Sequence, residues 1–505
     1  MLDSLASRLD REKDRLCTIF LAVLAFGLLA HGYGFLNFTI SHDSLGEFWT
    51  FQQMGYYDGT AAQWKIALGR FLCPVYQLIF RGETVAPWFS GMLALLWTGL
   101  AVWGVACLFH VRQRWLLIFT CGIFIANLSV TALTASYLHD LDADMFAVLA
   151  SVLAAVFWQR GGWRQLAAIG LLVITLGIYQ SMVSVYISLV IFLCILRLAE
   201  PEPVRAVFLD GLRAVGLLAA AGVVYLLLSK AACALSGLTL TQQENGMANM
   251  LSGDTGVFRL LADTCITWLS VFLTESPRIN TLFHGLLFLV SLAALVDVFR
   301  RRALPLGNKL LLALLLLLLP LGMNVSAFLN NGEVHLLMLY AAWLVYLLAL
   351  LLCRRSGRPG LILCCGLLLS LVLFSNIRFS NELYTRRNLE AQSTLSLMTR
   401  VSDRLERTEG YVPGQTEVAI LGTPDFPHHP GYYPTYETTG AIFTSPITTE
   451  DFYGAYFSTV LQTPIRLCDA QRREALARQA ADLPAFPDGS CTAWIDGTLV
   501  LKLSQ

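Results

Sequence analysis

The chain has 505 residues, of which 56% are hydrophobic and only 14% are charged. This balance excludes a soluble domain of ordinary composition and predicts an integral membrane protein. The 35 basic and 35 acidic residues cancel, so the charge indicates neither nucleic-acid binding nor a polybasic tether to a lipid surface.

The N-terminus is a charged prefix followed by an apolar run over residues 16–36, which is long enough to span ~30 Å of hydrocarbon. No A-x-A cleavage site follows it, so we expect an uncleaved first span rather than a signal peptide. Further apolar runs predict eleven spans in all. The others cover residues 86–109, 115–134, 143–158, 165–179, 181–196, 214–230, 279–298, 309–328, 334–352 and 360–377.

The charges of the loops predict the orientation. Every second loop is basic, as in HVRQRW, QRGGWR and CRRSGRP, whereas SYLHDLDAD, YQS and NNGE carry no Lys or Arg. Because positive charge marks cytoplasmic loops, we expect a cytoplasmic N-terminus and, with eleven spans, an outer C-terminus. Residues 165–196 would form one helix of about 48 Å at 1.5 Å per residue, so we expect a break at GIYQSMVS.

The expected fold class is an all-α polytopic membrane domain over residues 1–377, followed by a small extracytoplasmic α/β domain over residues 378–505. The membrane domain has outer loops at 37–85, 135–144 and 231–278. The last of these loops contains VFRLLADTCITWLSVFL, an amphipathic pattern typical of a helix that lies in the membrane interface.

The C-terminal domain alternates strand and helix patterns. EVAILGT predicts a strand, residues 469–482 predict a helix, and CTAWIDGTLVLKL predicts a hairpin that turns at Asp496 and Gly497. Its two cysteines, Cys468 and Cys491, could form a disulfide in an oxidising compartment.

Two carboxylates, Asp43 and Glu47, follow the first span in TISHDSLGEFW. Ionisable groups at the edge of a membrane are costly unless they face water or a partner, so both are functional candidates. The alternative is that Asp43 caps a short helix and that Glu47 interacts with the positive end of its dipole.

A second acidic cluster, YLHDLDADMF, contains His139, Asp140, Asp142 and Asp144 at the start of the fourth span. A capped helix start explains one of these carboxylates but not the others, so a functional role is favoured. Hard oxygen ligands of this kind suit Mg or Mn, which makes Asp140 and Asp142 an alternative metal site; no cofactor is required by the pattern.

The first outer loop also contains Lys65, Arg70 and Arg81, against the usual depletion of positive charge outside. An arginine fork is suited to hold a phosphate, although Lys65 and Arg70 could instead reach lipid headgroups from an interfacial helix. A carboxylate base together with cations that stabilise a departing phosphate is what sugar transfer from a lipid phosphate requires.

The motifs SHDSL, GRF, YLHDLDADMFAVLA and GIYQS resemble those of the type II serotype-converting glucosyltransferases that decorate bacterial O-antigen. The resemblance covers roughly residues 1–380 and, more weakly, the C-terminal tail, whose ending GSCTAWIDGTLVLKLS resembles that of similar envelope polysaccharide proteins. It implies a GT-C type fold in the bacterial cytoplasmic membrane, with the active site on the outer face. It also implies a polyprenyl-phosphate hexose donor, with glucose favoured, an envelope polysaccharide acceptor, and a donor-synthesising glycosyltransferase and a flippase in the same pathway.

Carried over by position, the resemblance implies that Asp43 is the catalytic base, that Asp140 and Asp142 form a second acidic site, and that Arg70 lies near the donor phosphate. Tyr179 and Gln180 would line the cavity, although such a pair also serves in helix packing. The remaining candidates for substrate binding are Glu47, Lys65 and His139.

A lipid-linked oligosaccharide flippase and a polysaccharide polymerase are the alternative functions. A flippase would be expected to contain inverted repeats and charged or broken helices at mid-membrane. No repeat is found, and the charges cluster at one face, which favours surface chemistry. A polymerase would be expected to use arginines in large outer loops rather than early carboxylates.

Overall fold

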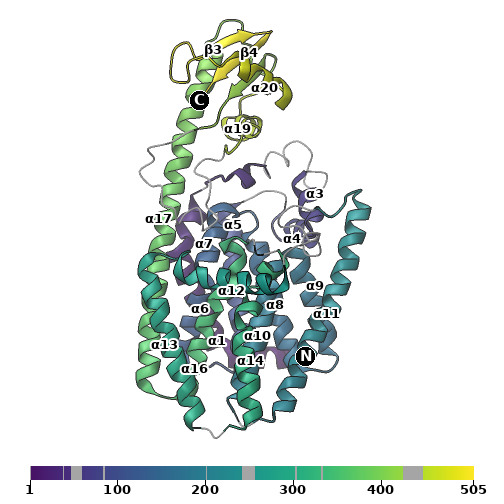
Figure 1. The fold of residues 1–505 in the computed structure, drawn as a ribbon, viewed down its shortest axis with the longest axis vertical. Helices are drawn as coiled ribbons and strands as arrows, with labels where there is room; N and C mark the ends of the chain where they lie inside the picture. The colour runs from purple at the N-terminus through teal and green to yellow at the C-terminus, as the bar shows by residue number, and fades with distance from the viewer. Residues whose placement is uncertain are drawn as a thin grey trace.

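The computed structural model describes residues 2–37, 39–46, 60–82, 86–200, 202–241, 256–301, 304–330, 332, 334–424 and 447–504. A bundle of long helices carries a small α/β domain at one end, and the two termini lie toward opposite ends of the molecule (Figure 1). Glu47 lies outside the described residues.

Within the described ranges, nine helices are long and apolar enough to span a membrane, and the pair α6–α7, bent by 41°, makes a tenth span. The shorter apolar helix α9 accounts for the remaining predicted segment. The chain is therefore a multi-pass, all-α membrane protein with a small α/β domain, as the sequence predicts. The elements are α1 (Leu2–Leu36), α5 (Pro87–Leu108), α6 (Arg114–Ile125), α7 (Leu128–Ser136), α8 (Leu141–Arg160), α9 (Arg164–Ile178), η1 (Gln180–Met182), α10 (Val183–Leu198), α11 (Val204–Leu235), α13 (Arg278–Arg301), α14 (Leu306–Met323), α15 (Val325–Leu329), η3 (Leu336–Leu344), α16 (Val345–Ser356) and α17 (Pro359–Glu406).

The predicted break within residues 165–196 is confirmed. Helix α9 ends at Ile178, Tyr179 has extended backbone angles (φ −152°, ψ 107°), and a single 3-10 turn begins at Gln180. The break places Tyr179 and Gln180 at the ends of helices. Their side chains can reach the loop that follows α1 from there.

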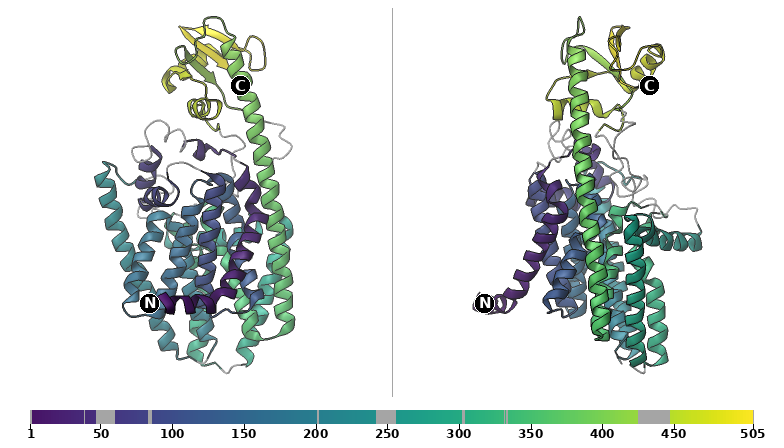
Figure 2. Two further views of the ribbon diagram at one scale, coloured as in Figure 1. Left: turned by 180° about the vertical axis from the view of Figure 1, so that it is seen from behind. Right: turned by 90° about the vertical axis from the view of Figure 1, so that its left-hand side faces the viewer.

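Helix α12 (Val257–Leu273) occupies the predicted amphipathic stretch. It runs across the direction of the spanning helices and projects from the side of the bundle (Figure 2, right). Apolar side chains such as Phe258 and Ile266 are 89% and 63% exposed. This orientation is the one expected of a helix that lies parallel to a membrane surface.

Helix α17 is a single helix of 48 residues, about 72 Å long at 1.5 Å per residue. It begins in the bundle, crosses position 377 without a break, and ends beside the sheet (Figure 1). A rigid helix rather than a flexible linker therefore joins the membrane part of the chain to the α/β domain.

The α/β domain contains a four-stranded sheet in the order β2-β1-β4-β3. Strand β1 is parallel to β2 and β4, whereas β3 and β4 form an antiparallel hairpin. Asp496 and Gly497 have positive φ angles of 46° and 80°, which confirms the predicted tight turn. The elements are β1 (Glu417–Leu421), α19 (Phe452–Tyr456), η4 (Phe457–Leu461), β2 (Arg466–Leu467), α20 (Ala470–Gln479), β3 (Thr492–Ile495) and β4 (Thr498–Lys502).

The disulfide considered for Cys468 and Cys491 is not formed, because both cysteines are free. Cys468 follows β2 at one edge of the sheet, and Cys491 precedes β3 at the other edge. Three strand spacings of about 4.8 Å separate these edges, about twice the Cα separation that a disulfide allows.

Candidate active site

Two short helices of the loop that follows α1, α3 (Thr60–Ala67) and α4 (Leu72–Phe80), lie at the end of the bundle nearest the α/β domain (Figure 1). Lys65 is in the last turn of α3, and Arg70 is in the connection to α4. Gly69 has a φ of +79°, and a Cβ there would lie 2.5 Å from the Tyr225 hydroxyl. The tight turn that presents Arg70 therefore requires glycine at position 69.

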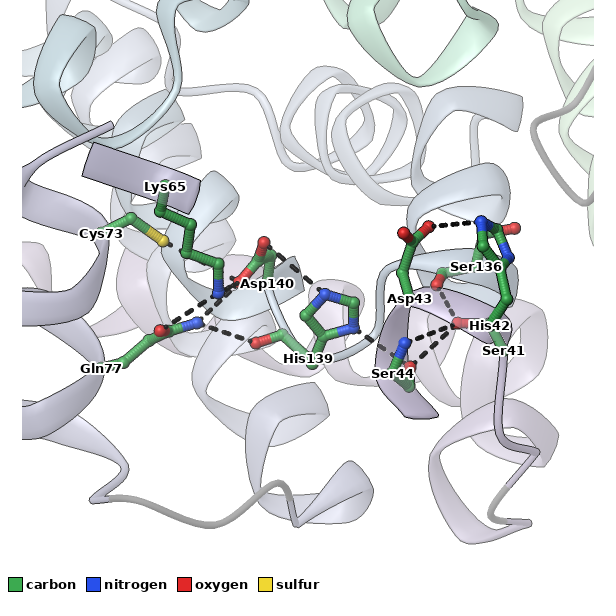
Figure 3. A network of polar contacts seen from close by, with 10 residues as sticks. All are labelled: Ser41, His42, Asp43, Ser44, Lys65, Cys73, Gln77, Ser136, His139 and Asp140. Carbon is green, nitrogen blue, oxygen red and sulfur yellow. Dashed lines mark hydrogen bonds and ion pairs between the residues drawn. The ribbon is translucent and has the colours of Figure 1, made fainter. Parts of the chain in front are cut away.

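Asp140, directly before α8, is the centre of a buried polar network (Figure 3). Lys65 Nζ donates to its Oδ1 at 2.7 Å, and Gln77 Nε2 donates to the same oxygen at 2.6 Å. Burial alone would raise the pKa of Asp140, but the charge of Lys65 outweighs burial and holds that pKa well below its usual range. Asp140 is therefore an ionised carboxylate that anchors Lys65.

His139 connects this network to the segment that carries Asp43. Its Nδ1 lies 3.1 Å from Ser44 Oγ, and Ser41 Oγ donates to the Ser136 carbonyl at 2.6 Å (Figure 3). The start of the loop that follows α1 is thereby fixed to the end of α7. Asp43 and Asp140, one from each acidic segment of the sequence, consequently belong to one site.

The Asp43 side chain is 33% exposed, and its Oδ2 lies 3.2 Å from His42 Nε2. Burial lowers the pKa of the His42 ring from its ordinary value, against the opposing charge of Asp43. Burial, together with the nearby Asp43 carboxylate, raises the pKa of the Tyr137 phenol. Asp43 is thus the accessible carboxylate of the site, with an imidazole ring and a phenol beside it.

A cavity of about 520 Å³ brings five of the sequence candidates together. Asp43, Lys65, Arg70, His139 and Asp140 all line it. The other lining residues are His42, Gly46, Gln63, Trp64, Ala67, Leu68, Tyr137, Leu238 and Phe452.

Tyr179 and Gln180 lie behind this cavity and do not line it. The Arg70 guanidinium carbon lies 4.4 Å from the centre of the Tyr179 ring, a cation–π contact. Gln180 Nε2 donates to the Leu68 carbonyl at 2.8 Å. Both residues hold the turn that presents Arg70, and within the described chain Arg70 itself forms no ion pair.

Asp142 does not line the cavity either. Its side chain is fully buried within the first turn of α8. There it interacts with the charge of Arg81 and with the Tyr76 hydroxyl. Asp140 precedes α8, whereas Asp142 lies within its first turn. The start of the helix therefore places Asp142 in the protein interior and leaves Asp140 at the cavity.

The surroundings of Asp140 do not suit the alternative Mg or Mn site. Lys65, Gln77 and, at 3.8 Å, the Cys73 thiol all direct donors at its Oδ1, whereas a cation requires oxygen acceptors. Across the described residues, no group of three His, Cys, Asp or Glu side chains could hold a metal ion.

The sequence candidates did not include several residues of the site, among them Gln77, Tyr137 and Phe452. Gln77 is an isolated polar residue inside an apolar helix, and Tyr137 is the first residue of the YLHDLDADMF motif, so the sequence contained a usable signal for both. No local pattern marks Phe452, which reaches the cavity from the far end of the chain.

A comparison with models of protein families finds a match to the family described as glucosyl transferase GtrII, over residues 32–378. The match covers more than half of the chain and includes Asp43, Arg70 and Asp140. No curated protein and no solved structure matches the chain.

Proposed function

The chain belongs to the GtrII family of glucosyl transferases, and we propose from this that it moves glucose from a polyprenyl-phosphate donor to an envelope glycan such as O-antigen. Family membership makes the protein a glycosyltransferase, and the family implies action on surface glycans. The flippase and polymerase alternatives are accordingly not favoured.

The observation that supports this proposal best is the shared cavity of Asp43 and Arg70. One is a partly exposed carboxylate and the other is a cation without an ion pair in the described chain. General base catalysis requires a carboxylate such as that of Asp43, and stabilisation of a leaving phosphate requires a cation such as that of Arg70.

In the proposed reaction, the acceptor hydroxyl oxygen attacks the anomeric carbon of the donor glucose, and its proton passes to the Asp43 carboxylate. The bond between that carbon and the phosphate oxygen breaks, and its electron pair leaves with the phosphate. The Arg70 guanidinium stabilises the charge that develops there. No step uses a metal ion or Asp142.

We place this site on the outer face of a bacterial cytoplasmic membrane, with the N-terminus cytoplasmic. The basic loops support this orientation, and the α/β domain stands at the end of the bundle that carries the cavity (Figure 1). The donor's lipid tail would stay in the bilayer while the glycan arrives from outside. A donor-synthesising glycosyltransferase and a flippase would supply the donor.

The test is transfer of radiolabelled glucose from polyprenyl phosphate to polysaccharide by purified protein in detergent. Asp43→Asn should lower the rate by about 10²- to 10⁴-fold, the range for loss of a general base, while the protein stays folded and monodisperse. Asp403→Asn is the control, because Asp403 is an exposed residue of α17. Parent treated with EDTA should remain active.

Full activity of Asp43→Asn would contradict the assignment of the base. Loss of activity after EDTA, restored by added Mg or Mn, would contradict the metal-free mechanism.

A further inference from the structure

One wall of the cavity comes from outside the region that matches the family. Phe452, in the first turn of α19 in the α/β domain, lines the cavity together with Asp43. Its ring meets the His42 ring edge-on, with 6.1 Å between the centroids. The family match ends at residue 378, so the matched region does not contain this wall.

The α/β domain also holds the segment that carries Asp43. Leu45 is fully buried in a hydrophobic cluster with residues of α17 and of the sheet, among them Met398 and Val418, and Ile40 packs against the same cluster. Asp43 lies between these two apolar anchors. The α/β domain could not move away from the bundle without exposing Leu45 to water.

The same segment is fixed on its other side to the membrane domain through Ser41 and Ser44. It is therefore shared by both domains, and the cavity is complete only when both are in place. This rules out an α/β domain that is merely tethered beside an independent membrane enzyme.

The two walls of the cavity differ in chemistry. Arg70 is held by Tyr179 and Gln180, which belong to the spanning bundle, so its wall suits a phosphate that arrives with a lipid in the membrane. Phe452 is an aromatic residue of the outer domain, and its half-buried ring can pack against the apolar C–H face of a sugar.

We propose that the α/β domain forms the acceptor side of the active site, and that Phe452 binds a sugar ring of the acceptor glycan by stacking. This inference rests on the proposed function, because it takes Asp43 as the base that meets the acceptor hydroxyl. Phe452 is a residue for acceptor binding and takes no part in proton transfer.

The experiment compares the full-length parent with Phe452→Ala and Phe452→Trp in the glucose-transfer assay. Loss of the stacked ring should raise the acceptor KM about tenfold, while the donor KM stays at the parental value. Phe452→Trp should keep the acceptor KM near that of the parent, because it retains an aromatic face.

Trp494→Ala is the matched control. Trp494 is an aromatic residue on β3 of the same domain, it is 46% exposed, and it does not line the cavity. Its removal should leave the acceptor KM unchanged. A parental acceptor KM for Phe452→Ala, or an equal rise for Trp494→Ala, would overturn the proposal.

A second measurement separates this inference from the proposed donor. Binding of lipid-free polysaccharide, released by mild acid from the envelope of the source organism, is titrated without donor. Phe452→Ala should bind it about tenfold more weakly than the parent, and equal binding would overturn the inference. A parent that binds this polysaccharide but transfers no glucose from polyprenyl phosphate would contradict the proposed donor alone.

Discussion

Asp43 and Asp140 are both carboxylates of one site, and their surroundings give them different roles. Asp140 is buried and paired with Lys65 at 2.7 Å, whereas the Asp43 side chain is 33% exposed and faces the cavity. A carboxylate that already accepts two strong hydrogen bonds is a poor proton acceptor. We therefore propose Asp43 as the base and Asp140 as the group that positions Lys65.

Lys65→Met should destabilise the protein by about 3–5 kcal/mol, because it leaves Asp140 as an unpaired buried charge. The pKa of Asp140 is lowered in the folded state, so the stability that the pair contributes is present above about pH 4 and is lost only in stronger acid. Thermal unfolding of the detergent-solubilised protein at pH 7 measures the effect.

The double variant Lys65→Met with Asp140→Asn is the control, since it removes both charges and should recover much of the loss. A Lys65→Met melting temperature equal to that of the parent would contradict the buried ion pair.

At the scale of an element, the turn between α3 and α4 decides where Arg70 lies. Gly69 makes this turn possible because its φ is +79° and because a Cβ at this position would lie 2.5 Å from the Tyr225 hydroxyl. Gln180 fixes the same turn through the Leu68 carbonyl. The break between α9 and η1 thus supports the cavity from behind, which explains a polar pair in the middle of an apolar run.

Gly69→Ala should lower glucose transfer by at least tenfold, because the added Cβ would meet the Tyr225 hydroxyl at 2.5 Å and displace the turn of Arg70. Gly82→Ala is the matched control. Gly82 has a similar φ of +74°, but its Cβ would meet nothing within 4 Å, so it carries only the backbone cost of about 1–2 kcal/mol. Equal transfer rates in the two variants would contradict the role of the Gly69 turn.

At the scale of the whole molecule, α17 sets the height of the α/β domain above the bundle. Its 48 residues form one helix without a break (Figure 1), and its last turns pack into the hydrophobic cluster that contains Leu45. The spacing between the two domains is therefore built into the length of a helix, and the cavity lies in that space.

Insertion of four alanines after Gln392 should abolish transfer, because it would lift the α/β domain by about 6 Å and turn it by about 40°. The same insertion after Pro413, in the exposed connection between α17 and β1, should leave transfer near the parental rate. Rates and melting temperatures of both proteins check this. Retained transfer after the Gln392 insertion would contradict α17 as the element that sets the spacing.

Local patterns were enough to predict the spans, the break before Gln180, the hairpin at Asp496 and the acidic and basic segments of the outer loops, because hydrophobic periodicity and turn residues act over short stretches of chain. Only the tertiary structure decided which of these charges meet. It paired Lys65 with Asp140, turned Asp142 away from the cavity, kept the two cysteines apart at opposite sheet edges, and brought Phe452 to Asp43. Each of these outcomes depends on helix direction or on packing between distant segments, which no short pattern encodes.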